Sequence, residues 1–157
     1  MPDHSEKRTE MKTYSTKLDD IKRTNHTLDA TDQVLGRLVT RAASLLMGKN
    51  KTIFTRSMDT GDFVTIINAE KVKVTGKKTE QKMYYRHSGY PGGFKPINYE
   101  KMMEAHPERV IEFAVKGMLP TNRLRARMMK RLRIYPGEAP QPVKAEAPVA
   151  ASEEKKG

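Results

Sequence analysis

Residues 63–68 read FVTIIN, a short apolar run rich in β-branched side chains. Such a run is typical of a strand in a parallel sheet that is covered on both faces. The preceding residues, 58–62, read MDTGD and predict a tight turn, in which Asp side chains accept hydrogen bonds from backbone N–H groups and Gly61 takes a positive φ. We therefore expect a buried strand that begins at Phe63, directly after this turn.

N-terminal to this strand, the hydrophobic pattern predicts one more strand and one long helix. Residues 25–30, NHTLDA, predict the strand. Residues 31–50 predict an amphipathic helix that Thr31 or Asp32 caps and that ends at Gly48. The apolar face of this helix comprises Leu35, Leu38, Val39, Ala42, Leu45 and Leu46.

C-terminal to residue 68 the same alternation continues. Residues 71–76 and 82–88 are two further candidates for short strands. Three further helices are expected, over residues 98–106, 107–117 and 121–134. Pro107 suits the first turn of the second of these helices, and Gly117 suits its end. The third would pack through Leu124, Met128 and Leu132. Strands that alternate with helices predict an α/β sandwich around a mostly parallel sheet.

Composition divides the chain into one domain and two tails. Residues 138–157 are rich in Pro, Ala, Glu and Lys and have almost no large apolar side chains. Such a segment buries too little apolar surface to offset the entropy of ordering, so we expect it to be disordered. Residues 1–11 are expected to form a flexible extension for the same reason. The single domain is therefore expected over residues 12–137.

Positive charge is the strongest functional signal in the sequence. The chain has 30 Lys and Arg against 19 Asp and Glu, a formal charge of +11. Each tail carries a net charge of −1, so residues 12–137 carry +13. A compact domain with this charge repels itself unless a polyanion neutralises it. The composition therefore predicts a nucleic-acid partner.

Several other classes of protein are disfavoured. The chain has no cysteine, which excludes disulfides and thiolate metal sites, and its four histidines have no ligand spacing. No apolar run approaches the roughly 20 residues of a membrane helix. The N-terminus does not read as a signal peptide. We therefore expect a cytoplasmic protein with no metal, no cofactor, no small-molecule substrate, no membrane partner and no homo-oligomer.

One group of basic residues lies in the segment 116–134, which has no acid. These residues are Lys116, Arg123, Arg125, Arg127, Lys130, Arg131 and Arg133. On a helix whose Leu/Met side packs inward, they would cover much of the outer surface. Like charges this close destabilise an isolated helix by a few tenths of a kcal/mol per pair, which favours a phosphate-bearing partner. We also expect Lys49 and Lys51, after the long helix, to contact RNA.

A second basic segment contains a glycine-rich loop, residues 84–95, YYRHSGYPGGFK. The cations expected to bind RNA here are Lys73, Lys77, Lys78, Arg86 and Lys95. His87 and the tyrosines offer rings for stacking on unpaired bases, most clearly Tyr90, whereas one of Tyr84 and Tyr85 is expected to pack in the core. The loop glycines Gly89, Gly92 and Gly93 would allow close approach of another backbone.

Two alternative functions remain open from the residues alone. Asp59 and Asp62 could hold Mg²⁺ in an RNA-processing enzyme, and the basic domain could compact DNA. Neither nucleotide-binding motif is present. Residues 75–79, TGKKT, lack the first glycine and the hydroxyl residue of a P-loop, and no G-x-G-x-x-G occurs. Catalytic residues are therefore not predicted.

Four segments together resemble the bacterial form of the large-subunit ribosomal protein thirteen family. They are LGRL at 35–38, MDTGDFVTIINAEKVKVTGKK at 58–78, YYRHSGYPGG at 84–93 and PERVIEFAVKGMLP at 107–120. The resemblance spans residues 11–137. The chain departs from the family at Arg125-Ala126-Arg127, where the family has Gly and Arg after Leu124.

This resemblance implies a fold, a function and partners. The expected fold is a three-layer α/β/α sandwich around a mostly parallel, four-stranded sheet. The implied function is that of a non-catalytic, structural constituent of the large ribosomal subunit, which binds the large-subunit (23S-type) rRNA early in assembly. Neighbouring large-subunit ribosomal proteins are the implied protein partners. Some members of the family also repress translation of mRNAs.

Overall fold

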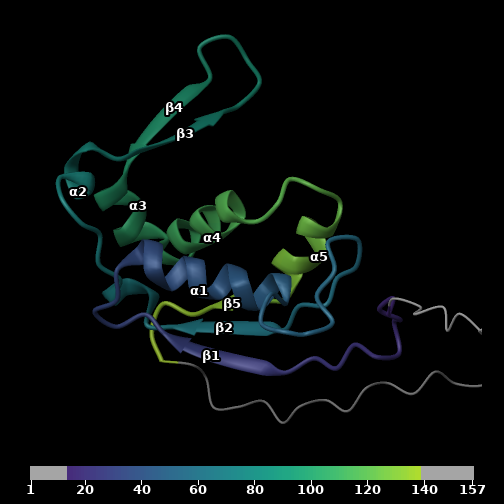
Figure 1. The fold of residues 1–157 in the computed structure, drawn as a ribbon. Helices are drawn as coiled ribbons and strands as arrows, with labels where there is room; N and C mark the ends of the chain where they lie inside the picture. Colours follow the sequence, from purple (N-terminus) through teal and green to yellow (C-terminus); the bar gives the residue numbers. More distant parts are fainter. Residues whose placement is uncertain (1–13, 139–157) are drawn as a thin grey trace, which may run out of the picture.

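The structure, a computed structural model, describes residues 14–138. Of the two predicted tails, 1–11 and all but the first residue of 138–157 lie outside the described residues. Three parallel strands form the main sheet in the order β1-β2-β5: β1 (Asn25–Asp29), β2 (Phe63–Ile67) and β5 (Leu132–Ile134). The strand predicted at residues 63–68 is therefore confirmed, since β2 begins at Phe63; it is the central strand and pairs on both sides (Figure 1).

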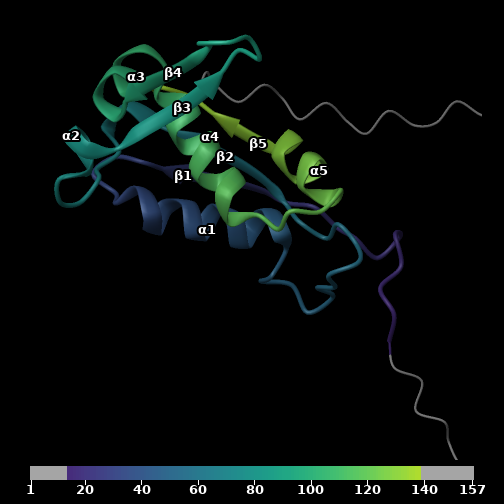
Figure 2. The same ribbon diagram turned by 90° about the horizontal axis from the view of Figure 1, so that it is seen from above.

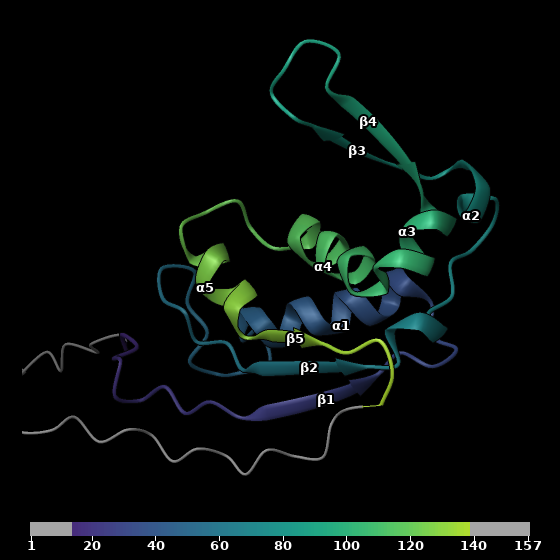
Figure 3. The ribbon, with the colours of Figure 1, turned by 180° about the vertical axis from the view of Figure 1, so that it is seen from behind.

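Three helices cover one face of this sheet. They are α1 (Leu35–Met47), α4 (Pro107–Met118) and α5 (Leu124–Lys130). The two parallel connections, β1 to β2 and β2 to β5, step across the sheet in the same direction. Right-handed crossovers in one direction place their helices on the same face. Figures 1 and 3 show this arrangement from the two sides.

Burial along β2 confirms that only one face is covered. Val64 and Ile66 are buried against the helices, whereas Thr65 and Ile67 on the other face are half-buried and Phe63 is 39% exposed. The expectation of a strand covered on both faces is wrong for residues 14–138. The expected second helical layer and fourth parallel strand are also not found there. The fold is a mixed α/β fold with a three-stranded parallel sheet.

Helix α1 supplies more of the buried core than any other element. Leu38, Val39, Ala42 and Leu46 are all fully buried, as the apolar pattern predicts. The helix ends at Gly48, whose φ of +77° is the left-handed conformation expected at this position.

The start of α1 differs from the prediction. Val34 stands at the N-cap, and neither Thr31 nor Asp32 caps the helix. The backbone N–H of Leu35 instead donates to the carbonyl of Lys73, 2.8 Å away. Residues 71–76 do not form the predicted strand. Beside this hydrogen bond, they pair only through a single bridge between Val34 and Lys73.

The remaining elements are short. Between β2 and α4 lie η1 (Ala69–Lys71), α2 (Lys78–Gln81), β3 (Met83–His87), β4 (Phe94–Asn98) and α3 (Tyr99–Ala105). Strands β3 and β4 form a separate antiparallel pair. Helix α4 runs through Gly117, the expected stop, to Met118. The expected helix 121–134 is divided into α5 and β5, so Leu132 is a strand residue.

The turn before β2 is held by a buried ion pair. Arg131, between α5 and β5, is only 6% exposed, and its guanidinium binds the carboxylate of Asp59. The same guanidinium donates to the carbonyls of Asp62 and Leu46, each 3.3 Å away. Gly61 does not take the expected positive φ. A Cβ on it would instead lie 1.8 Å from the carbonyl oxygen of Leu46. Close packing on α1 is therefore the reason for glycine here.

Arg131→Met is expected to destabilise the free protein by about 3–5 kcal/mol, because it leaves the carboxylate of Asp59 buried without a counter-charge. Urea unfolding of the free protein measures this loss. The adjacent exposed residue provides the control: Lys130→Met should change the free energy of unfolding by less than about 0.5 kcal/mol. Equal stabilities of the two variants would show that the ion pair does not hold the turn.

Candidate nucleic-acid interface

The β3–β4 hairpin extends away from the helical layer (Figures 1 and 3). Its base is anchored by Tyr84, whose ring centroid lies 5.9 Å from that of Phe113 on α4. Burial, with a smaller contribution from Tyr99, raises the pKa of Tyr84 to about 12, so this ring is a neutral packing element. The expectation that one of Tyr84 and Tyr85 packs in the core is confirmed, because Tyr84 is half-buried and Tyr85 is 68% exposed.

The two faces of the hairpin have different chemistry. On one face, the rings of Tyr85 and Phe94 stack with centroids 5.3 Å apart, and both remain exposed. On the other face, Arg86 lies opposite Lys95 in the strand register. His87 and Lys95 are also exposed. A polyanion could therefore meet rings on one side of this hairpin and cations on the other.

The loop at the tip of the hairpin, residues 88–93, is closed by its own backbone. The N–H of Ser88 donates to the carbonyl of Gly93, and the N–H of Gly93 donates to that of Tyr90. Gly92 has a φ of +72° and open space where a Cβ would stand, and Gly89 likewise has a positive φ. At Gly93 a Cβ would lie 2.0 Å from the hydroxyl of Ser88. The loop presents Tyr90, 77% exposed, at its turn.

A second group of cations lies around α5. Arg123, Arg127 and Lys130 are exposed, and Arg125 is half-buried. Lys116 is exposed near the end of α4, and Arg133 is exposed on the uncovered face of the sheet. These residues extend from one face of the molecule to the other, so the segment 116–134 is not a single continuous surface.

Two of the cations predicted to contact RNA have partners within the protein. Arg131 is an interior residue that binds Asp59, as described above. The Nζ of Lys51 is also engaged inside the fold, with the carboxylate of Asp62 and the carbonyls of Lys22 and Thr60. Arg131 is thus buried with its counter-charge, whereas Lys51, half-buried, shares its ammonium with three acceptors of the protein itself.

The predicted cations outside the segment 116–134, other than Lys51, are all exposed. Lys73 forms an ion pair with Asp32, 2.7 Å between charged atoms, at the surface. Lys77 and Lys78 stand at the start of α2, below the hairpin, and Lys49 follows α1. The structure thus brings Arg86, His87, Tyr90 and Lys95 together on the hairpin and leaves the others distributed over the surface.

The carboxylates considered for Mg²⁺ binding have structural partners. Asp59 binds Arg131 and lies 3.8 Å from Arg23. Burial raises the pKa of Asp62, but hydrogen bonds from Lys51, the Thr24 N–H and His26 outweigh this effect and lower it overall. Within residues 14–138, no cluster of three His, Cys, Asp or Glu side chains could hold a metal ion. In the same residues, no helix is long and apolar enough to cross a bilayer.

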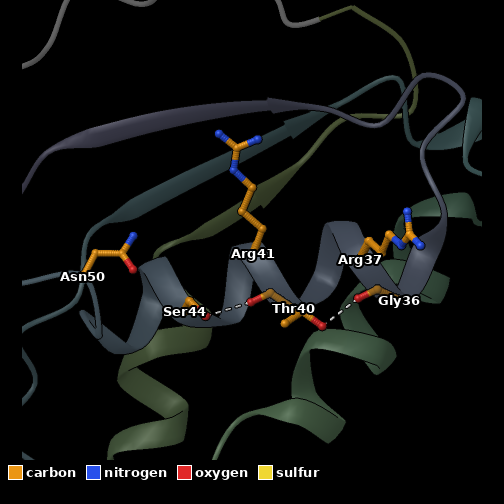
Figure 4. Close-up of a pocket in the computed structure, with 6 residues that line it drawn as sticks. All are labelled: Gly36, Arg37, Thr40, Arg41, Ser44 and Asn50. Atoms are coloured by element: carbon orange, nitrogen blue, oxygen red, sulfur yellow. Dashed lines mark hydrogen bonds between the residues drawn. The ribbon is translucent and has the colours of Figure 1, made fainter.

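One basic surface was missed by the sequence analysis. A groove of about 470 Å³ runs along the outer side of α1 (Figure 4). Its lining residues are Gly36, Arg37, Thr40, Arg41, Ser44 and Asn50. The available signal was the absence of Asp and Glu between Asp32 and Asp59, a segment that contains five cations.

Comparison with known proteins agrees with the resemblance in sequence. The profile of the family described as "Ribosomal protein L13" matches residues 23–141. The "Large ribosomal subunit protein uL13" of Herpetosiphon aurantiacus is 57% identical over 129 residues, which cover 82% of this chain and 90% of the relative. The protein of the same name from Salinispora arenicola is 54% identical over 139 residues, covering 88% and 94%. The chain belongs to the ribosomal protein L13 family.

Proposed function

We propose that this protein is a non-catalytic, structural constituent of the large ribosomal subunit in the cytoplasm, where it binds large-subunit rRNA and supports subunit assembly. Its relatives carry the name of a large-subunit protein, and the family is structural. Neighbouring ribosomal proteins are further proposed partners. The proposal of rRNA binding rests on the charge and geometry of the chain itself.

The hairpin is the single observation that supports rRNA binding most strongly. No acidic residue occurs between Glu80 and Glu100, so the whole β3–β4 unit carries only positive and neutral side chains. The hairpin protrudes, which places these cations and the exposed rings at a distance from the protein body (Figure 1). Cations bind phosphates of any sequence, and rings stack on unpaired bases. A folded RNA with both features fits this surface better than a small nucleotide.

The two alternatives receive less support. An RNA-processing enzyme would need Asp59 and Asp62 free for metal ions, yet both bind cations of the protein. A DNA-compacting protein would bind duplex DNA at least as tightly as folded RNA, and exposed rings are of little use against stacked base pairs.

Binding to large-subunit rRNA should weaken steeply with salt. Each phosphate that the protein neutralises lowers log K by about 0.7–0.9 per unit of log salt. Filter binding of the free protein to a transcript of large-subunit rRNA, at several salt concentrations, measures the slope. Duplex DNA of equal length is the competitor. A flat salt response would exclude a phosphate contact, and preferential binding of the DNA would favour the DNA-compacting alternative.

The exposed cations of α5 should matter for assembly and little for folding. The triple variant Arg123→Glu, Arg127→Glu, Lys130→Glu should be depleted from large subunits relative to the wild type. Its free energy of unfolding should change by no more than roughly 0.5 kcal/mol per residue, because none of the three is buried. Sedimentation of lysates from cells that express both forms measures incorporation. Normal incorporation would remove α5 from the RNA-binding surface.

Substitutions of the loop glycines can distinguish backbone strain in the free protein from the loss of an RNA contact. Gly92→Val keeps open space around the new side chain but forces a β-branched residue to a φ of +72°, at a cost of about 1–2 kcal/mol. We expect a defect in competition with wild type for incorporation that exceeds what the measured loss of stability explains. Gly93→Val is the comparison variant, because its new side chain collides with Ser88 within the loop. If Gly92→Val melts earlier but competes normally once folded, the loop is only a turn.

A further inference from the structure

The groove on α1 has the chemistry of a phosphate-binding surface. Arg37 and Arg41 line it from adjacent turns of the helix, and Asn50 closes one end (Figure 4). Both arginines are exposed, and neither forms an ion pair within the part of the chain that the structure describes. Like charges at a spacing of four residues destabilise an exposed helix by a few tenths of a kcal/mol. An anion between the two guanidinium groups would remove this repulsion.

The other lining residues make the groove accessible without competing for an anion. Gly36 has no side chain, and nothing lies within 4 Å of the position where its Cβ would stand. The hydroxyl of Thr40 donates to the carbonyl of Gly36, and that of Ser44 donates to the carbonyl of Thr40. The free donors of the groove are therefore the two guanidinium groups and the Asn50 side-chain amide. Guanidinium groups bind phosphate oxygens in a bidentate manner.

The position of this groove separates it from the hairpin. Figure 2 shows α1 along one edge of the body and the β3–β4 hairpin at the opposite edge, with α4 between them. Buried side chains of α1, such as Leu38 and Val39, face the core, so the groove opens on the outer side of the helix.

We propose that the α1 groove binds the phosphate backbone of a second segment of rRNA, so that the protein bridges two RNA segments. This inference rests on the proposed function, because it requires that the hairpin binds rRNA. It adds that Arg37 and Arg41 form an independent contact, which none of the predicted RNA-binding residues supplies. A protein with two such contacts holds together RNA segments that are distant in the RNA sequence.

The test compares two double variants that remove equal charge. Arg37→Gln/Arg41→Gln removes the groove cations, and Lys101→Gln/Arg109→Gln removes two exposed cations from α3 and α4, where Glu100, Glu104, Glu108 and Glu112 also lie. With a transcript of large-subunit rRNA, the groove variant should lower the slope of log K against log salt by about 1.4–1.8, for two lost phosphate contacts. The control should leave the slope close to the wild-type value.

Hydroxyl-radical footprinting on the same transcript identifies the segments. The wild type should protect two segments; the groove variant should lose one of them, and Arg86→Gln/Lys95→Gln should lose the other. Because the chain has no cysteine, a photocrosslinker can be placed on Ser44→Cys alone, and it should react within the segment that the groove variant loses. Thermal unfolding checks that the variants remain folded; all change exposed side chains except Ser44→Cys, which changes a half-buried one.

The outcomes separate this inference from the proposed function. A groove variant with the slope and footprint of the control overturns the bridging proposal while rRNA binding stands. Reduced incorporation into subunits with an unchanged footprint also overturns it, and would indicate an acidic protein segment as the occupant of the groove. A wild type without affinity for the transcript overturns the proposed function, and the bridging proposal with it.

Discussion

The buried pair of Arg131 and Asp59 connects the three parts on which the fold depends. Arg131 lies between α5 and β5, Asp59 lies in the turn before β2, and the guanidinium also binds the carbonyl of Leu46 near the end of α1. Two charges this deeply buried are costly to desolvate, and the pair is tolerated because further hydrogen bonds satisfy the guanidinium. This cross-link joins the last strand of the main sheet to the end of the first helix.

Charge is divided over the surface in a way that orients the molecule. The hairpin, α5 and the outer side of α1 present cations, whereas α3 and α4 present Glu100, Glu104, Glu108 and Glu112 at regular spacing. A polyanion is attracted to the first set and repelled by the second. The net charge of the domain therefore understates the specificity of the arrangement, because four of its exposed acids lie together on α3 and α4.

The sequence predicted the local elements well and the long-range contacts poorly. Periodicity located α1 and β2 because the core selects apolar residues at fixed spacing. The same periodicity did not show that Arg131 is buried, because the seven cations in 116–134 look alike in the sequence. Arg131 differs from the others only through its partner Asp59, which lies 72 residues away. Leu132 was assigned to a helix because Leu124, Met128 and Leu132 share a helical spacing. In the structure, strand pairing of Leu132 with Val64 overrides this local preference. The groove on α1 was missed because its arginines occur singly.

The sheet topology has a consequence for the order in which the chain folds during synthesis. Pairing in the main sheet is parallel and non-local: β1 pairs with β2 at Asn25–Phe63, and β2 pairs with β5 at Val64–Leu132. The carboxylate of Asp59 and the edge of β2 that pairs with β5 are therefore synthesised long before their partners. They remain without these partners until nearly the whole domain has been made. Such high contact order slows folding and exposes unpaired edges meanwhile. The core of this protein therefore closes only after β5 has been synthesised.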